Sequence, residues 1–292
     1  MDISIVIVNY KTKDLTLQTL NSVFKAEPPK GKMEVILVDN ASEDGTPAIV
    51  GKKYSQVKII KSPDNLGFAG GNNLGLRQAK GRYILLLNSD TIINKNTLTT
   101  MVKFMDANPQ AGLSTCRIDL LNGKIDPASH RGFPTPWAAL TYFSGLEKLF
   151  PHSKIFSQYH QGWKDLTKVH EIDSPVGAFF FLRKKALDQV GLLDEQFFMY
   201  GEDIDLAFRI KKAGWKVMYV PLTNITHLKG ASGLNKKSTK QRLTTTESFF
   251  SAMKIFYKKH YQKKYFFLFR LLMFLGIDLI KQLRFLKIRL GL

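Results

Sequence analysis

Short apolar runs alternate with longer mixed segments along the N-terminal part of the chain. The runs are SIVIV (4–8), EVILV (34–38), VKII (57–60) and YILLL (83–87). They are nearly continuous rather than alternating, which is typical of strands that are covered on both faces. The segments between them have the length of helices and cover residues 14–26, 44–54 and 69–80. This order predicts an α/β fold, a three-layer α/β/α sandwich with a mainly parallel central sheet.

Every predicted strand is followed by polar residues. In chain order these are Asn9-Tyr10, Asp39-Asn40-Ala41-Ser42, Ser62-Pro63-Asp64-Asn65 and Asn88-Ser89-Asp90. Loops are polar in most proteins, so any single strand end carries little information. In open α/β sheets, however, ligands sit beyond the carboxyl ends of the strands. Four ends rich in Asn and Asp at one edge of the sheet therefore favour a binding crevice.

The segment NLGFAGGNNLG (65–75) places Gly67 and Gly70 close to Asn73, at the start of a predicted helix. Glycine lets the backbone approach a ligand closely, and free N–H groups at a helix start attract anions. A diphosphate is therefore a plausible ligand, although this pattern alone is weak. No G-x-G-x-x-G follows the first strand and the chain has no G-x-x-x-x-G-K-[ST] loop, which disfavours dinucleotide-binding and P-loop proteins. Residues 118–175 are less regular, with a helix predicted near 137–149, and we expect the second substrate there.

Three acids stand at the start of a predicted helix in GEDIDLAFRIKKAGW (201–215). Helical phase places Asp203 on the apolar face that packs on the protein, where a carboxylate suits a general base. Asp205 has Arg209 four residues on, the spacing of an ordinary surface ion pair. Acids in a first turn also complement the helix dipole, and this alternative stays open for Glu202 and Asp205.

His227 follows another apolar run, WKVMYV, in a segment that continues to Gly230 and Ser232. A lone histidine is more often structural than a metal ligand. A neutral imidazole and Asp90 could together hold one divalent ion, so both interpretations of His227 remain open.

Composition limits the class of protein. A chain of 292 residues with 44% hydrophobic content can bury a large core. Cys116 is the only cysteine, which excludes an intramolecular disulfide and favours a reducing compartment. The apolar run at the N-terminus is too short for a secretion signal and has no basic leader. We therefore expect a cytoplasmic location.

The formal net charge is +19, and from Lys229 to Leu292 there are 15 Lys and Arg against two acids. Lys263, Arg270, Lys281 and Arg284 fall within roughly 60° on a helical wheel and leave a wide apolar face. Embedded charges disfavour a transmembrane span, so the segment is predicted to lie in the interface of an anionic membrane. Packing on the catalytic domain is the alternative. The expected division is a domain at 1–235 and a helical, basic and apolar extension at 236–292.

Several motifs together resemble family 2 glycosyltransferases of the GT-A fold, particularly bacterial rhamnosyltransferase-like members. They are VDNASEDGT, PDNLGFAGGNNLG, LLLNSDT, GAFFFLRKKAL and DEQFFMYGEDIDLAFRIKKAGW, followed by His227. They span residues 3–232 in the expected order. No single motif is specific, but the ordered set is.

The resemblance implies a role for each matching residue. Tyr10 and Asp39 would bind the nucleotide base, and 65–73 would lie near the sugar nucleotide. Asp203 would be the catalytic base of an inverting reaction, and His227 an additional metal ligand. The predicted substrate-binding set is Tyr10, Asp39, Asn40, Asn65, Gly67, Gly70, Asn73, Asn88, Ser89 and Glu202.

Asn88-Ser89-Asp90 stands where the family has D-x-D, so Asn88 replaces the first aspartate. An amide forms hydrogen bonds but brings no charge. Metal binding should then depend on Asp90, His227 and the donor diphosphate, which suits Mg²⁺ or Mn²⁺ held mainly with the substrate.

The resemblance implies sugar transfer from a nucleotide-sugar donor, with L-rhamnose from dTDP-L-rhamnose as a candidate, to a glycan or lipid-linked acceptor in cell-surface polysaccharide synthesis. The enzyme would work peripherally at the cytoplasmic face of the membrane. A catalytically silent sugar-nucleotide-binding module is one alternative. A nucleic-acid-binding protein is another, disfavoured because the charge lies among aliphatic and Phe residues and no recognition motif is present.

Overall fold

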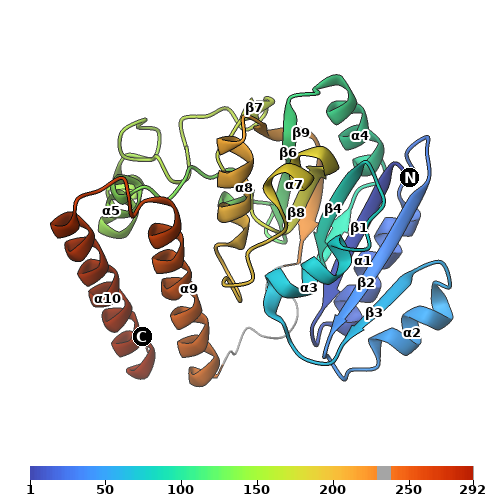
Figure 1. Cartoon of the computed structure of the whole chain (residues 1–292), viewed down its shortest axis with the longest axis horizontal. Coiled ribbons are helices and arrows are strands. Elements are labelled where there is room, and N and C mark those ends of the chain that lie inside the picture. Colours follow the sequence, from blue (N-terminus) through green and yellow to red (C-terminus); the bar gives the residue numbers. More distant parts are fainter. Residues whose placement is uncertain (229–237, 292) are drawn as a thin grey trace.

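The computed structural model describes residues 1–228 and 238–291 (Figure 1). The strands are β1 (Ile3–Asn9), β2 (Met33–Asn40), β3 (Lys58–Ser62), β4 (Tyr83–Asn88), β5 (Thr91–Ile93), β6 (Ala111–Leu120), β7 (His170–Glu171), β8 (Phe179–Arg183) and β9 (Lys216–His227). The helices are α1 (Lys13–Lys25), α2 (Thr46–Lys53), α3 (Gly67–Leu76), α4 (Thr97–Ala107), α5 (Pro136–Ser144), α6 (Leu146–Leu149), α7 (Lys184–Val190), α8 (Glu202–Lys212), α9 (Thr239–His260) and α10 (Phe267–Arg289), with a 3₁₀ turn at Pro127–Ser129.

The nine strands of the described residues belong to one sheet, in the order β3-β2-β1-β4-β8-β6-β9-β5, with β7 beside β9. Strands β1 to β4 are mutually parallel, and β6 and β9 run in the same direction. The antiparallel members are β5, β7 and β8. The prediction of a mainly parallel sheet is confirmed, and the antiparallel strands all come after β4 in the chain.

The predicted elements of the first ninety residues are all present, with small shifts at their ends. The largest shift is in α3, which begins two residues before the predicted 69 and ends at Leu76 rather than 80. The helix expected near 137–149 is divided into α5 and α6 at Gly145, where a φ of 82° turns the backbone out of the helical path.

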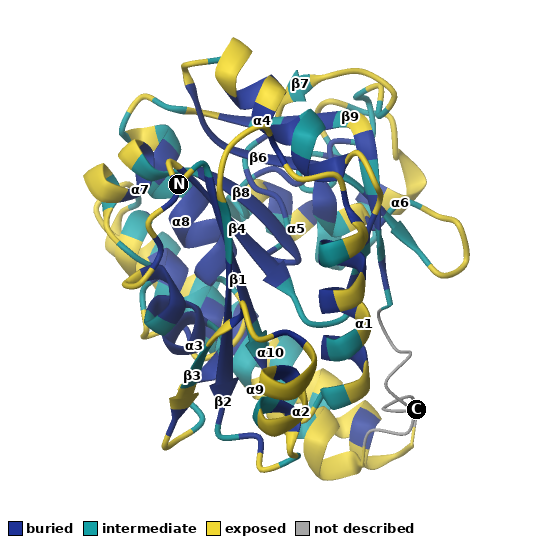
Figure 2. Ribbon diagram, turned by 90° about the vertical axis from the view of Figure 1, so that its right-hand side faces the viewer, coloured by how far each residue is buried: buried dark blue, intermediate teal, exposed yellow. Residues whose placement is uncertain are grey.

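Alternate residues of the central strands belong to two separate apolar clusters, one on each face of the sheet. On β1, Ile5 packs with Leu20 of α1 and Met101 of α4, whereas Val6 packs with Leu76 of α3 and Leu206 of α8. Figure 2 shows the sheet as a buried layer between helices whose outer faces are exposed. The three-layer arrangement is therefore confirmed.

A third apolar cluster joins the C-terminal helices to the rest of the molecule. Phe197 and Ile204, before and within α8, pack with Phe250 and Phe256 of α9 and with Ile277 of α10. In the described part of the chain, no helix is long and apolar enough to cross a membrane. The expected boundary between 235 and 236 lies outside the described residues.

Candidate active site

Two cavities meet beyond the carboxyl ends of the parallel strands. The first, here called the strand-end cavity, is lined by Val8, Tyr10, Thr12, Asn40, Asn65, Gly67, Phe68, Asn72, Leu87, Asn88, Ser89, Asp90, Phe198 and Met199. It contains residues from the ends of β1, β2 and β4 and from the start of α3. The crevice predicted from the polar strand ends is therefore present in the structure.

The second, here called the helix-walled cavity, shares Phe68, Asn88 and Met199 with the first. Its polar floor contains Arg131, Glu202 and Asp203. The apolar walls come mainly from α5 and α9 and include Ala139, Tyr142, Phe143, Phe249, Ala252, Met253 and Phe256. The cavity encloses about 350 Å³, within the range of small-molecule sites.

A hydrogen-bond network fixes the backbone at the entrance to α3. The Asn40 amide donates to the Asn65 side chain (3.0 Å) and to the Gly67 carbonyl (2.9 Å), and it accepts from the Leu66 N–H. Gly67 has a φ of +70°, and a Cβ there would lie 2.2 Å from the Phe198 carbonyl oxygen. A glycine is required at this position, because the loop before α8 crosses it at close range.

The structure does not place all the predicted substrate-binding residues in a cavity. Gly70 and Asn73 line neither of them, and Asn73 instead bonds the backbone of Leu193 and the Glu195 carboxylate. Asp39 is buried at the end of β2 and accepts a hydrogen bond from Asn9 (2.9 Å).

The glycines inside α3 serve packing. A Cβ on Gly75 would lie 2.3 Å from the Val6 side chain of β1. These glycines bring the helix close to the sheet. The sequence had instead led us to expect that they bring the backbone close to a ligand.

Asp90 and His227 come together because β5 and β9 pair antiparallel, with Thr91 opposite His227. Asp90 Oδ1 lies 3.2 Å from His227 Nε2, and Asp126 Oδ2 lies 3.5 Å from Nδ1 on the other side of the ring. A carboxylate behind a ligating histidine is a common way to orient the ring towards a metal. The arrangement fits a divalent ion held by Asp90 and Nε2.

The protein alone supplies few ligands for a divalent ion at this site. Among residues 1–228 and 238–291, no three acidic, His or Cys side chains converge closely enough to bind an ion. Burial alone would lower the pKa of His227, but hydrogen bonds and charges from Asp126 and Asp90 outweigh it and raise the pKa to about 9. An ion bound at Nε2 would therefore have to displace a proton. Two protein ligands leave most coordination positions to other oxygens, such as those of a diphosphate.

Asp203 is buried on the floor of the helix-walled cavity, as its helical phase predicted. Its Oδ2 accepts a hydrogen bond from the Arg131 guanidinium at 2.5 Å, and its Oδ1 accepts from the Ile204 N–H. Arg131 is itself buried and also donates to the Pro175 carbonyl. An ion pair of this kind fixes the position of one carboxylate oxygen.

Glu202 is also buried in this cavity, but it has no such partner. Its Oε2 makes no hydrogen bond within the described chain. Burial, and then the charge of Asp203, raise the pKa of Glu202 well above its usual range. The raised pKa favours the neutral acid, which can donate a hydrogen bond to a ligand.

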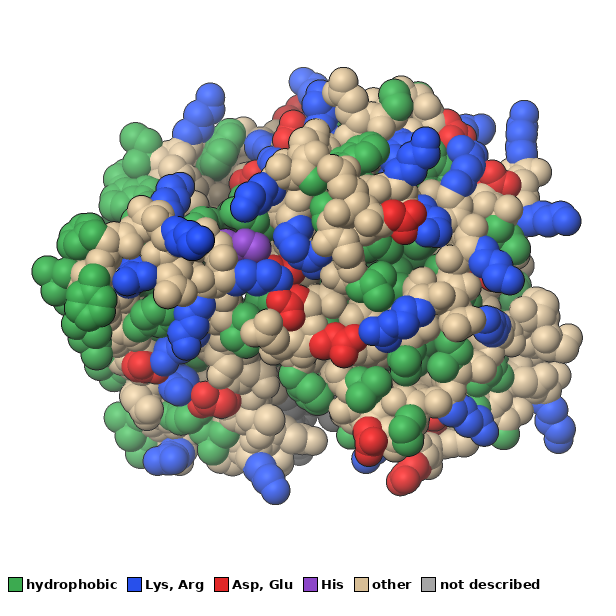
Figure 3. Space-filling view, viewed as in Figure 1, with side chains coloured by type: hydrophobic (Ala, Val, Ile, Leu, Met, Phe, Trp, Pro, Cys, Tyr) green, Lys and Arg blue, Asp and Glu red, His purple; other side chains and the backbone are tan. Residues whose placement is uncertain are grey.

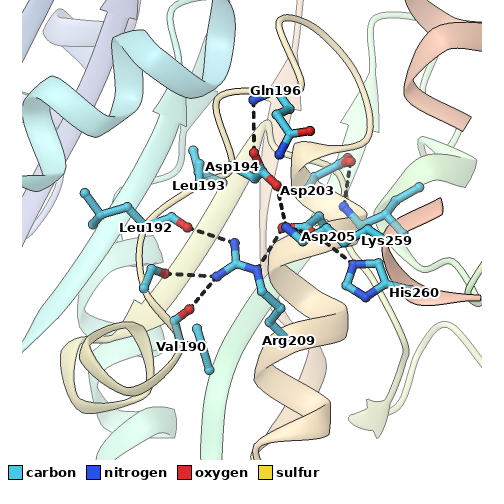
Figure 4. Close-up of polar contacts among 12 residues, drawn as sticks. Val190, Leu192, Leu193, Asp194, Gln196, Asp203, Asp205, Arg209, Lys259 and His260 are labelled. Carbon is cyan, nitrogen blue, oxygen red and sulfur yellow. Dashed lines mark hydrogen bonds and ion pairs between the residues drawn. The ribbon is translucent and has the colours of Figure 1, made fainter. Parts of the chain in front are cut away.

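Asp205 differs from the prediction. It does pair with Arg209 (2.8 Å), but it is completely buried rather than on the surface (Figure 4). Lys259 and His260 of α9 bind its other oxygen at 2.8 and 2.7 Å. The prediction was wrong because α9, which begins 34 residues later in the chain, covers this side of α8.

Sequence reasoning missed Asp126 and Arg131. Both lie in the irregular segment DPASHRG, where no periodic pattern shows which side chains point inwards. A charged residue between prolines and aromatics was the only available signal, and it does not identify the partner. Only the tertiary fold brings Asp126 to His227 and Arg131 to Asp203.

Comparison with known proteins gives a consistent result. The model of the family described as Glycosyl transferase family 2 matches residues 4–191, more than half of the chain. The N-acetylglucosaminyl-diphospho-decaprenol L-rhamnosyltransferase of Mycobacterium tuberculosis is 27% identical over 215 residues, covering 68% of each chain.

Two solved structures share the fold. TarS of S. aureus has a TM-score of 0.56 at 19% identity, covering 85% of this chain and 65% of that one. The mannosyltransferase PcManGT of Pyrobaculum calidifontis, in complex with GDP-Man and Mn²⁺, has a TM-score of 0.59 at 17% identity, covering 88% and 64%. The chain thus spans slightly less than two thirds of each of these structures, and at this identity the likeness concerns the fold alone, a GT-A glycosyltransferase fold.

Proposed function

The chain belongs to glycosyl transferase family 2, and we propose that it transfers a sugar from a nucleotide-sugar donor to an acceptor hydroxyl with inversion at the anomeric carbon. The rhamnosyltransferase among its relatives supports L-rhamnose from dTDP-L-rhamnose as the donor group. The same relative, named for a decaprenol-linked substrate, supports a glycan or lipid-linked acceptor. The proposal includes a role in cell-surface polysaccharide synthesis at the cytoplasmic face of the membrane.

The observation that carries the proposal is the position of Asp203 on the floor of a cavity that shares Phe68, Asn88 and Met199 with the strand-end cavity. The strand-end cavity contains the polar strand ends and Asp90, as a nucleotide diphosphate requires, and we assign the donor to it. The helix-walled cavity contains Asp203 and has apolar walls, and we assign the acceptor to it. Asn88 lines both, so the anomeric carbon would lie close to this residue.

Asp90 and His227 are the residues that would hold Mg²⁺ or Mn²⁺, with Asp126 orienting the imidazole. The ion would act as a Lewis acid that stabilises the negative charge on the departing diphosphate. The solved complex of PcManGT, which contains GDP-Man and Mn²⁺, supports this choice of cofactor.

In the proposed reaction the acceptor oxygen attacks the anomeric carbon from the side opposite the diphosphate. The bond from that carbon to the diphosphate oxygen breaks, and the nucleoside diphosphate leaves with the electron pair. The hydroxyl proton moves to Asp203. Arg131 holds and orients this carboxylate, which accepts the proton. Glu202, whose raised pKa favours the neutral acid, would hydrogen-bond a substrate hydroxyl.

The apolar walls bear on the class of acceptor. Tyr142 and Phe143 of α5 face Phe249 and Met253 of α9 around the polar floor. Such walls suit the apolar face of a sugar ring, or the first part of a lipid, next to the reacting hydroxyl. A highly charged acceptor surface would be poorly matched to them.

A panel of nucleotide sugars, each tested with Mn²⁺, with Mg²⁺ and with chelator, tests the proposal. The donor should protect the protein against thermal unfolding only with metal, and its hydrolysis or transfer should require metal. We expect Asp90→Ala to abolish metal-dependent turnover and Asn88→Asp to be tolerated. Full activity of Asp90→Ala in chelator contradicts the metal assignment. Donor binding with no turnover by the wild type indicates a silent binding module instead.

A further inference from the structure

Helix α10 has two opposite apolar faces. One face packs on the protein, where Ile277 and Ile288 are buried and Met273, Phe274 and Ile280 are partly buried against the third cluster. The other face is exposed. It consists of the residues here called the leucine stripe: Leu268, Leu272, Leu275, Leu279, Leu283, Leu286 and Leu290.

The members of the leucine stripe are three or four residues apart, so they share one side of the helix along its whole length. Exposed Phe266 and Phe267 extend the apolar surface at its N-terminal end. Figure 3 shows hydrophobic side chains gathered along the left edge of the molecule, where Figure 1 places α10. A continuous apolar stripe of this length on a solvent-exposed surface indicates an interaction site.

Two of the four cations that share one side of the helical wheel contact the rest of the protein. Lys281 and Arg284 lie on the packed side: Lys281 pairs with Glu247 of α9 (3.2 Å), and Arg284 lies over the Phe143 and Phe250 rings at 5.9 and 5.8 Å. These contacts of Lys281 and Arg284 hold α10 against the rest of the protein. The two alternatives from the sequence, packing and membrane contact, therefore apply to different faces of the same helix.

Exposed cations nevertheless border the leucine stripe. Lys263 and Lys264 lie in the turn before α10, and Lys287 and Arg289 lie near its C-terminal end. On an ideal helix Lys287 and Arg289 are roughly 80–100° to either side of the stripe's centre. The apolar surface is thus bordered by positive charge at both ends, as in helices that lie in a membrane interface.

Charge complementarity decides between a bilayer and a second copy of the chain. Residues 229–292 carry 15 basic against two acidic side chains, so two copies meeting at this helix would bring like charges together. An anionic bilayer has the opposite sign. We propose that the leucine stripe lies in the headgroup region of an anionic membrane, with the bordering cations at the lipid phosphates.

The membrane contact bears directly on the acceptor site. Phe143, which Arg284 of α10 contacts, lines the helix-walled cavity together with Phe249 and Met253 of α9. A membrane-bound α10 would thus hold the cavity beside the bilayer. On the basis of the proposed function, this position selects a lipid-linked acceptor that enters from the membrane.

Vesicle co-sedimentation of the full chain tests the surface. We compare vesicles of phosphatidylglycerol mixed with phosphatidylcholine against phosphatidylcholine alone. Leu272→Ser/Leu279→Ser removes two stripe residues that are 60% and 62% exposed, and the matched control Leu121→Ser/Leu222→Ser removes leucines that are 61% and 60% exposed elsewhere. We expect the stripe variant to bind anionic vesicles on the order of 30-fold more weakly, and the control to bind as the wild type does.

Three further measurements separate the explanations. Sedimentation equilibrium should show the same mass for the wild type and the stripe variant. If the wild type is a dimer and the stripe variant is a monomer, a second copy of the chain is the partner and the proposal is overturned. Equal vesicle binding by the stripe and control variants also overturns it. Donor hydrolysis by the stripe variant in solution should equal that of the wild type. If neither protein hydrolyses any donor while vesicle binding behaves as expected, the proposed function fails and the membrane surface stands.

Discussion

The two sides of helix α8 carry the same residue type in different surroundings. On the cavity side, Asp203 has one cationic partner, Arg131, and faces open space. On the α9 side, Asp205 is surrounded by Arg209, Lys259 and His260 with no space left. Both carboxylates are buried, so burial alone does not mark a catalytic group. The difference is whether the carboxylate can still reach a substrate.

Substitutions of Asp203 and Asp205 should differ most strongly in their effect on sugar-transfer activity. Asp203→Asn keeps the shape but cannot accept a proton, and we expect about a 10³-fold loss of sugar transfer. Asp205→Asn should stay within about threefold of the wild type per folded molecule, because Asp205 does not line a cavity. Initial rates at saturating donor, with the folded fraction measured by circular dichroism, check both. Similar losses in the two variants contradict the distinction.

Stability should show the opposite order. Asp205→Asn removes a buried negative charge from Arg209, Lys259 and His260, and we expect a loss of about 3 kcal/mol. Asp203→Asn affects one ion pair beside a cavity and should cost less. Urea unfolding of both variants measures the difference. A larger loss for Asp203→Asn would mean that Arg131 and Asp203 serve the fold more than the site.

As the pH falls, the ion pairs of Asp205 on the α9 side of α8 should be weakened first. Burial alone would raise the pKa of Asp205, but His260, Arg209 and Lys259 outweigh it and lower the pKa to about 2. A lowered folded-state pKa stabilises the protein above the unfolded value of about 3.9, and this stabilisation is lost as the pH falls towards 2. The stability gap between wild type and Asp205→Asn should therefore narrow from about pH 5 downwards. A constant gap in urea unfolding over this range contradicts the ion-pair description.

The smallest expected effect, and the most specific test on the cavity side, is a substitution of Glu202. Because its pKa is raised, the neutral carboxylic acid is favoured, and Gln imitates that form. We expect Glu202→Gln to keep transfer within about fivefold, with the change in KM rather than in kcat. A loss as large as that of Asp203→Asn would show that Glu202 works as a carboxylate.

The sequence predicts the parts of this molecule that follow a local period. The four strands, their polar ends and the inward phase of Asp203 all come from spacing along a single element. The predicted pairing of Asp205 and Arg209 was correct, but its place on the surface was not. Its burial depends on α9, and no period within α8 contains that information.

Contacts between distant segments could not be predicted for the same reason. Asp126 and Arg131 reach the site only through the fold of an irregular segment. Helix α10 is apolar on two sides, so a helical wheel shows its faces without showing which one packs. The packed face contains Lys281 and Arg284, which contact Glu247 and the Phe143 and Phe250 rings.

The assignment of proton transfer to Asp203, and of donor binding to the strand-end cavity, can be tested by one paired measurement. Calorimetry with Mn²⁺ and dTDP-L-rhamnose, or the nucleotide sugar that best protects the wild type, gives the donor Kd of the wild type and of Asp203→Asn. We expect the two Kd values to agree within about threefold while transfer by the variant is about 10³-fold slower. Donor affinity lost in step with activity, or transfer retained by Asp203→Asn, would contradict this assignment.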